Sequence, residues 1–316
     1  MLSGNFGNIG VLMGGYSSER EISLRSGQAV AEALSQEGHR VIPLDITDHD
    51  PEKIIFQIKA VPLDIAFIAL HGRLGEDGVI QGILEALEIP YTGSGMKASQ
   101  MAFNKILTQQ ALKTAGLPIA ENYFIKDGQI LDFKTAWAAI KSTPLVVKPA
   151  CEGSSIGVHI VRHPSEWETA LKSALSFGPQ VIVEQFIRGR EVTVGILGHE
   201  ALPLVEICTK ANFFNFTAKY QKGATEYICP AEISGSLAGR IKELSLAAYD
   251  VLGCEAFARV DWRIDEGQQP FILEINTIPG FTGTSLFPKA AREAGYSFVQ
   301  VCEKLLCLAY GKKIRR

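Results

Sequence analysis

Two short stretches near the C-terminal end of the chain carry residues that could do chemistry together. The first contains Arg259 and Asp261, the second contains Glu274 and Asn276, and the turn-like residues 265–269 separate them. Both stretches alternate apolar and polar residues, which predicts two strands joined as a hairpin. With the turn centred at residues 267–268, Asp261 faces Glu274 and Arg259 faces Asn276.

Period-2 alternation places these four side chains on one sheet face, in strands whose other residues, Phe257, Val260, Leu273 and Ile275, predict a core. Two carboxylates directly opposed on a sheet repel each other, and desolvation increases the cost. A divalent cation removes this repulsion, and carboxylate and amide oxygens suit Mg²⁺ bound together with substrate phosphates. The alternatives are that these side chains face solvent, or that Arg259 simply neutralises Asp261. A single arginine does not balance two carboxylates, which favours the metal site.

A second candidate site is the segment that follows Lys148. This lysine ends a predicted strand, and the loop Glu152-Gly153-Ser154-Ser155 comes soon after it. Backbone N–H groups and serine hydroxyls in such a loop can close over phosphates, while the lysine supplies a positive charge. The loop is not a Walker A motif, because no GK[ST] follows and the next element is a strand. On these residues alone, a flexible surface hairpin is an equal alternative.

Two loops in the first third of the chain follow predicted parallel strands and carry polar residues. His71 lies in the loop 70–78 and Glu19 in the loop 13–21. Ligands of open α/β sheets bind beyond the carboxyl ends of the strands, so both residues are candidates for substrate contact. Alternatively, His71 is structural and Glu19 favours a helix dipole. The stretch 93–98 loosely matches a dinucleotide-binding pattern. Its preceding strand is very short and no acidic residue follows about 20 positions later, which argues against a nicotinamide-dependent dehydrogenase.

The predicted elements that must position these residues fall into two patterns. Strands at 9–13, 40–44 and 64–70 alternate with helices at 19–37 and 79–87, which predicts an α/β unit with a doubly wound parallel sheet. From about residue 100 a helix at 102–115 precedes strands that often follow one another directly, which predicts an α+β part with antiparallel pairing. These strands are expected at 145–148, 158–161, 181–185, 191–197, 256–262 and 271–275, with a further helix at 237–252.

Length and composition exclude several classes of protein. The chain has 316 residues, of which 47% are hydrophobic, so it can form two or three globular units. No apolar run approaches the roughly 20 residues of a membrane span, and the first residues lack a signal-peptide pattern, so we expect a cytoplasmic protein and no membrane partner. With 31 basic and 34 acidic residues and no extended basic run, we expect no nucleic-acid partner. The six cysteines show no metal-binding spacing and are expected to be free thiols.

Taken together, the motifs resemble the ATP-grasp superfamily and, within it, the D-alanine–D-alanine ligase family. The resemblance covers nearly the whole chain and rests on six strings in order: Ser18-Glu19-Arg20-Glu21, Ala69-Leu70-His71-Gly72, Pro90-Tyr91-Thr92-Gly93-Ser94-Gly95, Lys148-Pro149 with Glu152-Gly153-Ser154-Ser155, Ala218-Lys219-Tyr220, and Glu274-Ile275-Asn276-Thr277-Ile278-Pro279-Gly280. We accordingly expect an ATP-grasp fold with an N-terminal substrate-binding unit (1–96), a central ATP-grasp unit (97–183) and a C-terminal unit with the metal and catalytic residues (184–316).

The resemblance also implies a role for each candidate residue. ATP phosphates would be held by Lys105, Lys148 and Lys219, adenine by the strand edge Glu184, Gln185, Phe186 and Ile187, and ribose by Glu191. Two Mg²⁺ ions, with Mn²⁺ able to substitute, would be bound by Asp261, Glu274 and Asn276. Arg259 and the Gly280 N–H would stabilise the acyl phosphate and the tetrahedral intermediate. Glu19, assisted by Ser154 and Tyr220, would hold the ammonium group of the first substrate amino acid. Ser285 and the Leu286 N–H would bind the carboxylate of the second substrate amino acid. His71 would line the same pocket.

The implied activity is the ATP-dependent, ADP-forming ligation of two D-alanine molecules through an acyl phosphate, for peptidoglycan precursor synthesis. In the resemblance, Tyr220 favours an amine over a hydroxy acid as the second substrate, and the segment Lys210 to Cys229 is the candidate lid over the reaction. The family implies a homodimer. The alternatives are another ATP-grasp carboxylate–amine ligase and a nucleotide-binding regulator without catalysis.

Overall fold

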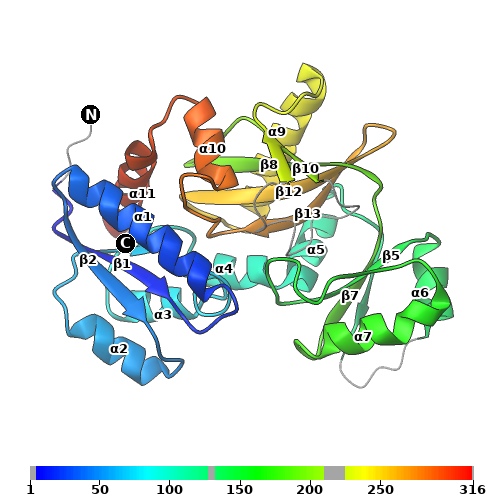
Figure 1. Cartoon of the computed structure of the whole chain (residues 1–316), viewed down its shortest axis with the longest axis horizontal. Helices are drawn as coiled ribbons and strands as arrows, with labels where there is room; N and C mark the ends of the chain where they lie inside the picture. Colours follow the sequence, from blue (N-terminus) through cyan, green and yellow to red (C-terminus); the bar gives the residue numbers. More distant parts are fainter. Residues whose placement is uncertain (1–4, 127–131, 210–224, 315–316) are drawn as a thin grey trace.

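The chain forms three sheets surrounded by helices, as Figure 1 shows for the computed structural model of the protein. The structure describes residues 5–126, 132–209 and 225–314. Within these ranges no helix has the length and apolar character needed to cross a membrane. The mixture of a parallel sheet with two antiparallel sheets confirms the predicted combination of α/β and α+β architecture.

The N-terminal sheet is parallel and has the strand order β2-β1-β3. Its strands are β1 (Asn8–Gly14), β2 (Arg40–Ile46) and β3 (Ile65–Ile68), and the helices that follow them in turn are α1 (Arg20–Gln36), α2 (Pro51–Lys59) and α3 (Val79–Ala86). Ile9 and Val11 pack on one face with α1, while Leu12 packs on the other face with α2 and α3. This alternation explains why a β1 with six buried residues out of seven has helices on both sides, as predicted.

The central sheet is antiparallel and has the order β4-β7-β5-β6. Its strands are β4 (Asn122–Ile125), β5 (Leu145–Pro149), β6 (His159–Val161) and β7 (Val181–Gln185), with α6 (Phe133–Ile140), the short 3₁₀ turn η1 (Pro164–Glu166) and α7 (Trp167–Leu175) between them. Trp167, Ala170 and Ala174 of α7 are buried against the sheet. This sheet presents Lys148 of β5 and Glu184 of β7 as buried charged residues.

The helix predicted over 102–115 is wrong at its start. Two helices occupy this region, α4 (Met96–Phe103) and α5 (Lys105–Thr114), and Asn104 lies between them with extended backbone angles. The Asn104 side chain accepts hydrogen bonds from the N–H groups of Ile106 and Leu107, so it caps α5. The break places Lys105 at the first position of a helix, directed toward the cleft.

The C-terminal sheet has the order β11-β10-β8-β12-β13, with β9 paired to β8. The strands are β8 (Gly189–Leu197), β9 (Glu200–Ala201), β10 (Val205–Thr209), β11 (Thr225–Ile228), β12 (Phe257–Asp265) and β13 (Pro270–Asn276). Helix α9 (Gly235–Val251) packs against β8 and β12, and α10 (Leu286–Glu293) packs against β8. The last helix, α11 (Phe298–Ile314), returns to α1 and β3, so the end of the chain completes the N-terminal layer.

The β12–β13 hairpin has the register expected from the sequence where it matters for chemistry. Asp261 pairs with Glu274 and Arg259 pairs with Asn276, as predicted. A bulge then shifts the register between Asp261 and Trp262, which leaves Leu273 as an extra residue on β13. Leu273 was expected in the core, but it is half-buried and lines the same cleft as Glu274, because the bulge places neighbouring residues on one face.

The opposite face of β12 is held by α9 through a buried indole. Trp262 is fully buried and donates from Nε1 to the Ser245 hydroxyl at 3.0 Å, and this hydroxyl donates to the Ile241 carbonyl at 2.7 Å. Since the neighbouring residues on β12 project into the cleft, this contact fixes the strand whose other face carries the candidate site.

We predict that Ser245→Ala lowers the free energy of unfolding by about 1–3 kcal/mol, because it leaves the buried Trp262 N–H without its acceptor. The measurement is the urea unfolding midpoint followed by tryptophan fluorescence, with the exposed Ser176→Ala as the control. An unchanged midpoint for Ser245→Ala would contradict this role of the hydroxyl.

Candidate functional site

One cleft brings together every predicted site residue that the structure describes. The loop before α1 and the loop after β5 line it on one side. The C-terminal end of β7, the first residues of β8, the polar face of β12 and β13, and the residues that lead into α10 complete it. Seventeen of the predicted residues line it: Glu19, His71, Lys105, Lys148, Ser154, Glu184, Gln185, Phe186, Ile187, Glu191, Arg259, Asp261, Glu274, Asn276, Gly280, Ser285 and Leu286. The other two, Lys219 and Tyr220, and most of the candidate lid lie outside the described residues.

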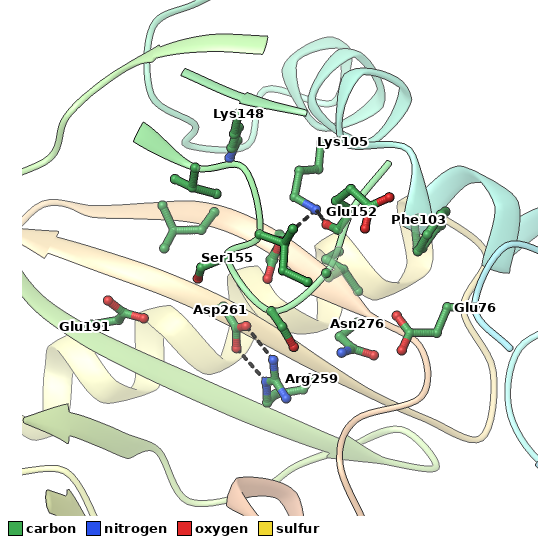
Figure 2. Close-up of a pocket in the computed structure, with 18 of the residues that line it drawn as sticks. Glu76, Phe103, Lys105, Lys148, Glu152, Ser155, Glu191, Arg259, Asp261 and Asn276 are labelled. Atoms are coloured by element: carbon green, nitrogen blue, oxygen red, sulfur yellow. Dashed lines mark hydrogen bonds and ion pairs between the residues drawn. The ribbon is translucent and has the colours of Figure 1, made fainter. Parts of the chain in front are cut away.

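Each of the two opposed carboxylates has its own cationic partner. Arg259 binds Asp261 through two hydrogen bonds, from Nε to Oδ1 and from Nη2 to Oδ2, both 2.7 Å long (Figure 2). Lys105 Nζ lies 3.2 Å from Glu274 Oε2. As expected, the single arginine does not balance both carboxylates, but Lys105 supplies a second cation from α5, so the charge balance alone does not require a metal ion.

Attraction to these carboxylates keeps both cations charged. Burial alone would lower the pKa of Arg259, but the Coulombic attraction of Asp261 and their hydrogen bonds raise it above its ordinary value. Burial likewise opposes the charge on Lys105, and Glu274 raises the pKa of its ammonium. The cleft thus holds two paired and charged cation–carboxylate contacts.

The donor set fits a hard cation that is shared with a ligand. Asp261, Glu274 and Asn276 present only oxygen and amide groups from one face of the hairpin, and Asn276 Oδ1 also accepts from the Ile278 N–H at 2.9 Å. Among the described residues no group of three or more His, Cys, Asp or Glu side chains is placed to hold a metal by itself. Two carboxylates and an amide suit Mg²⁺ when substrate oxygens complete its shell.

Lys148 and Glu184 form a buried ion pair across the central sheet. Their Nζ and Oε2 atoms are 2.6 Å apart, and Gln109 Nε2 donates to the other carboxylate oxygen at 2.7 Å. Both carboxylate oxygens of Glu184 are thus engaged by protein groups, and its side chain is only 4% exposed. The side chain of Glu184 thus holds Lys148 in place.

Arg263 is a residue of the cleft that the motifs did not single out. It lies 3.3 Å from Glu191 Oε2 on the neighbouring strand β8 and donates to the Gly189 carbonyl at 3.0 Å. The sequence does indicate that Arg263 belongs to the cleft, because Arg259, Asp261 and Arg263 alternate along β12 and therefore share one face.

The loop after β5 is folded over the cleft and contacts the N-terminal layer. The Ser154 hydroxyl donates a short hydrogen bond to Glu19 Oε1, and Lys105 Nζ donates to the Glu152 carbonyl at 2.6 Å. A Cβ on Gly153 would lie 2.6 Å from Glu19 Oε2, so a side chain at this position would displace the Glu19 carboxylate. Consecutive left-handed residues, Ser154 and Ser155, turn the loop back on itself. Glu19 is the N-cap residue of α1, yet its side chain makes no capping bond and serves the loop instead.

The segment from Gly280 to Leu286 closes the cleft at the start of α10. Ser285 Oγ accepts from the Thr282 N–H at 3.0 Å, and Leu286 is the first residue of α10. The N–H of a first helical residue has no partner within its own helix, which makes this terminus suited to an anionic group.

His71 and Glu76 line the cleft and are both buried. Glu76 Oε1 accepts from the Gly72 N–H at 3.0 Å and lies 3.7 Å from His71 Nδ1. Burial raises the pKa of Glu76 above its ordinary value, although the interaction with His71 opposes this shift. Glu76 belongs to the loop 70–78, but the sequence predicts no role for it. The burial of a loop carboxylate has no local sequence signal.

Comparisons with known proteins agree over most of the chain. Residues 8–54 and 49–94 match the family model described as D-ala D-ala ligase N-terminus, and residues 111–307 match the model for the C-terminus of the same ligases. The D-alanine–D-alanine ligase of Desulforudis audaxviator is 46% identical over 305 residues, covering 95% of this chain and 98% of that protein. The corresponding ligase of Geotalea uraniireducens is 45% identical over 302 residues, covering 95% of each. The crystal structure of the Bacillus anthracis D-alanine–D-alanine ligase complexed with ATP is similar with a TM-score of 0.85 at 31% identity, covering 98% of this chain and 99% of that one.

The raised pKa of Glu76 predicts a pH-dependent stability difference. A carboxyl that binds its proton more tightly in the folded state favours folding below its ordinary pKa, and this contribution is lost as the pH rises toward the folded-state value. Glu76→Gln removes this dependence, so the unfolding free energy of the variant relative to wild type should be higher at pH 8 than at pH 5. Urea unfolding at both pH values measures it, with the exposed Glu37→Gln as the control. A difference that does not change with pH, or that has the opposite sign, would contradict the shift.

Proposed function

The chain belongs to the D-alanine–D-alanine ligase family, and we propose that its cleft carries out that family's reaction on two molecules of D-alanine and one of ATP. The observation that carries this proposal is the paired register of β12 and β13, which sets Asp261 opposite Glu274 with Arg259, Lys105 and the Gly280 segment around them. The reaction yields D-alanyl-D-alanine, ADP and phosphate, and its product serves peptidoglycan precursor synthesis.

A carboxylate is a poor electrophile, so the γ-phosphoryl group of ATP is first transferred to a carboxylate oxygen of the first D-alanine. The bond between the γ-phosphorus and the bridging oxygen breaks, ADP leaves, and an acyl phosphate forms. The neutral amine of the second D-alanine then attacks the acyl carbon, loses a proton and expels phosphate. Catalysis therefore requires charge stabilisation around the phosphoryl group and positioning of two amino acids.

For the nucleotide, we assign Lys105 and Lys148 to the phosphates, residues 184–187 to adenine and Glu191 to ribose. The fixed Lys148–Glu184 pair supports this assignment, because it orients an ammonium at the edge of the cleft. Lys219 belongs to the same proposed set but lies outside the described residues.

Asp261, Glu274 and Asn276 are the groups proposed to hold Mg²⁺, as two ions for which Mn²⁺ can substitute. When bound, the metal ions neutralise negative charge on the transferring phosphoryl group. A cation bound by Asp261 and Glu274 would weaken their contacts with Arg259 and Lys105. The Arg259 and Lys105 side chains would then be available to substrate oxygens. Nucleotide binding would in this way be linked to assembly of the site.

Arg259 and the Gly280 N–H are proposed to stabilise the negative oxygen of the acyl phosphate and of the tetrahedral intermediate. By comparison with other oxyanion sites, each donor contributes on the order of 3–4 kcal/mol. Glu19 would hold the ammonium of the first amino acid, with Ser154 fixing its carboxylate. Tyr220, which is outside the described residues, belongs to this proposed network.

Ser285 and the Leu286 N–H are proposed to bind the carboxylate of the second D-alanine, beside His71. This assignment is supported by the N-terminus of α10, whose dipole and N–H groups favour an anion. We also propose that the protein works as a homodimer in the cytoplasm and that the segment 210–229 forms its lid.

The direct test is mass spectrometry of the products from ATP, Mg²⁺ and either D-alanine or L-alanine. We expect one dipeptide for each ADP with D-alanine and no dipeptide with L-alanine. A dipeptide formed only from other amino acids would indicate a different carboxylate–amine ligase. Nucleotide binding without any product would indicate a regulator.

We predict that Glu274→Gln lowers kcat by at least about 100-fold while the protein stays folded, because it removes a proposed metal ligand without a change in side-chain volume. The readouts are phosphate release at increasing Mg²⁺ and circular dichroism. Glu266→Gln, an exposed carboxylate in the turn of the same hairpin, is the matched control and should retain wild-type activity. Near-normal turnover by Glu274→Gln would count against the metal assignment.

A further inference from the structure

A buried hydroxyl joins α1 to the segment that carries Gly280. Ser26 of α1 is fully buried, and its Oγ accepts a hydrogen bond from the Phe281 N–H at 3.3 Å. The same oxygen lies 3.0 Å from Nε2 of His71. The other ring nitrogen of His71, Nδ1, lies 3.1 Å from the Ile278 carbonyl oxygen. These contacts connect three segments that are distant in the sequence.

The partners of His71 determine where its protons are. A carbonyl oxygen only accepts, so Nδ1 must carry the proton that is donated to Ile278. In a neutral imidazole Nε2 is then an acceptor, and the Ser26 hydroxyl must donate to it. Ser26 therefore accepts from one backbone N–H and donates to the ring, and both ring nitrogens of His71 are used by protein groups.

The two backbone contacts lie on either side of Gly280. The Ile278 carbonyl precedes the Pro279–Gly280 peptide, and the Phe281 N–H follows it. Fixing both flanks restricts rotation of the peptide whose N–H belongs to Gly280. We propose that Ser26 is a positioning residue for ligation: through His71 and directly, its hydroxyl aims the Gly280 N–H at the reacting carboxyl group. This inference rests on the proposed role of Gly280 in the reaction.

The position of Ser26 on α1 gives the contact a second consequence. The N-cap residue of the same helix is Glu19, whose carboxylate is proposed to hold the first ammonium. Seven residues of helix correspond to a rise of about 10 Å. One rigid element thus sets both the group that binds the ammonium of the first amino acid and the group that stabilises its reacting carboxyl oxygen. His71 acts here as a positioning residue at the wall of the pocket.

The Gly280 segment has an independent anchor, so loss of the hydroxyl should shift it rather than unfold it. The Phe281 ring packs among Phe67, Phe257, Phe287 and Phe298, with ring centroids 5.3–6.0 Å apart. Ser26→Ala leaves this cluster in place and removes only the polar contacts. The expected effect is therefore on turnover more than on folding.

The test compares Ser26→Ala with Ser23→Ala in the full-length enzyme. Ser23 is a matched control: it is also fully buried on α1, and its hydroxyl also accepts from a backbone N–H, of Gly14, and donates to a carbonyl, of Ala69, each at 2.8 Å. Its contacts lie in the β1–β3 region and not at Gly280. The thermal unfolding temperature should fall by a similar amount in both variants, whereas kcat should fall only in Ser26→Ala.

We expect Ser26→Ala to lower kcat for dipeptide formation by about 10- to 100-fold, a part of what loss of a whole oxyanion donor costs. The KM for ATP should stay within about two-fold, because the nucleotide groups lie on other elements. Ser26→Cys, which keeps a weak donor, should be intermediate, and it is the variant to use if Ser26→Ala does not fold. Equal kcat values for the Ser26 and Ser23 variants, or a loss confined to the KM for ATP, would overturn the proposal.

A second measurement does not depend on catalysis. Nitrogen-15 NMR of histidine-labelled protein, with His71 assigned by substitution, should show its proton on Nδ1, and a proton on Nε2 would overturn the proposed geometry. Failure of this inference is distinct from failure of the proposed function. If the ligase assignment itself is wrong, the wild-type protein forms no dipeptide from D-alanine, whatever the state of His71.

Discussion

The structure of the cleft depends on two carboxylates that face each other across the β12–β13 hairpin. Asp261 and Glu274 are brought together by strand register, and like charges at such a pair destabilise a sheet unless cations balance them. Arg259 from the same strand and Lys105 from α5 supply these cations. Because Lys105 begins a separate helix, the charge balance of the hairpin adds an ion pair to the apolar packing of α5 against β13. In the proposed function, the charges that stabilise the fold are also those that would bind the phosphates of the nucleotide.

Much of this arrangement could be predicted because it follows from local periodicity. Alternation in residues 257–276 determines which side chains share a face, and the turn at 265–269 determines which residues face each other. The doubly wound N-terminal sheet was predictable for a similar reason, since apolar strands alternate with amphipathic helices there. The division of the chain at residues 96 and 183 and the chemical role of each residue stay predictions, since packing alone does not assign them.

The parts that sequence could not predict depend on contacts between distant segments. Lys105 becomes the partner of Glu274 only after Asn104 ends one helix and caps the next, and no pattern in either segment encodes the other. The bulge that moves Leu273 into the cleft arises in the pairing of two strands and has no signature in one of them. The burial of Glu76 has the same origin, because it depends on loops that the fold brings over it.

Reaction at such a cleft requires that groups from separate layers keep their distances to within a fraction of an ångström. A sheet hairpin can fix Asp261 and Glu274 by itself, but Glu19 and Gly280 come from different parts of the chain. Helix α1 provides the link, since its N-terminus bears Glu19 and its buried face holds the Gly280 segment through Ser26. The loop at Ser154 adds a third contact to Glu19 from the central unit. A hydrogen-bonded path thus joins all three layers, in addition to the apolar core that the N-terminal layer shares with β8, β12 and α10.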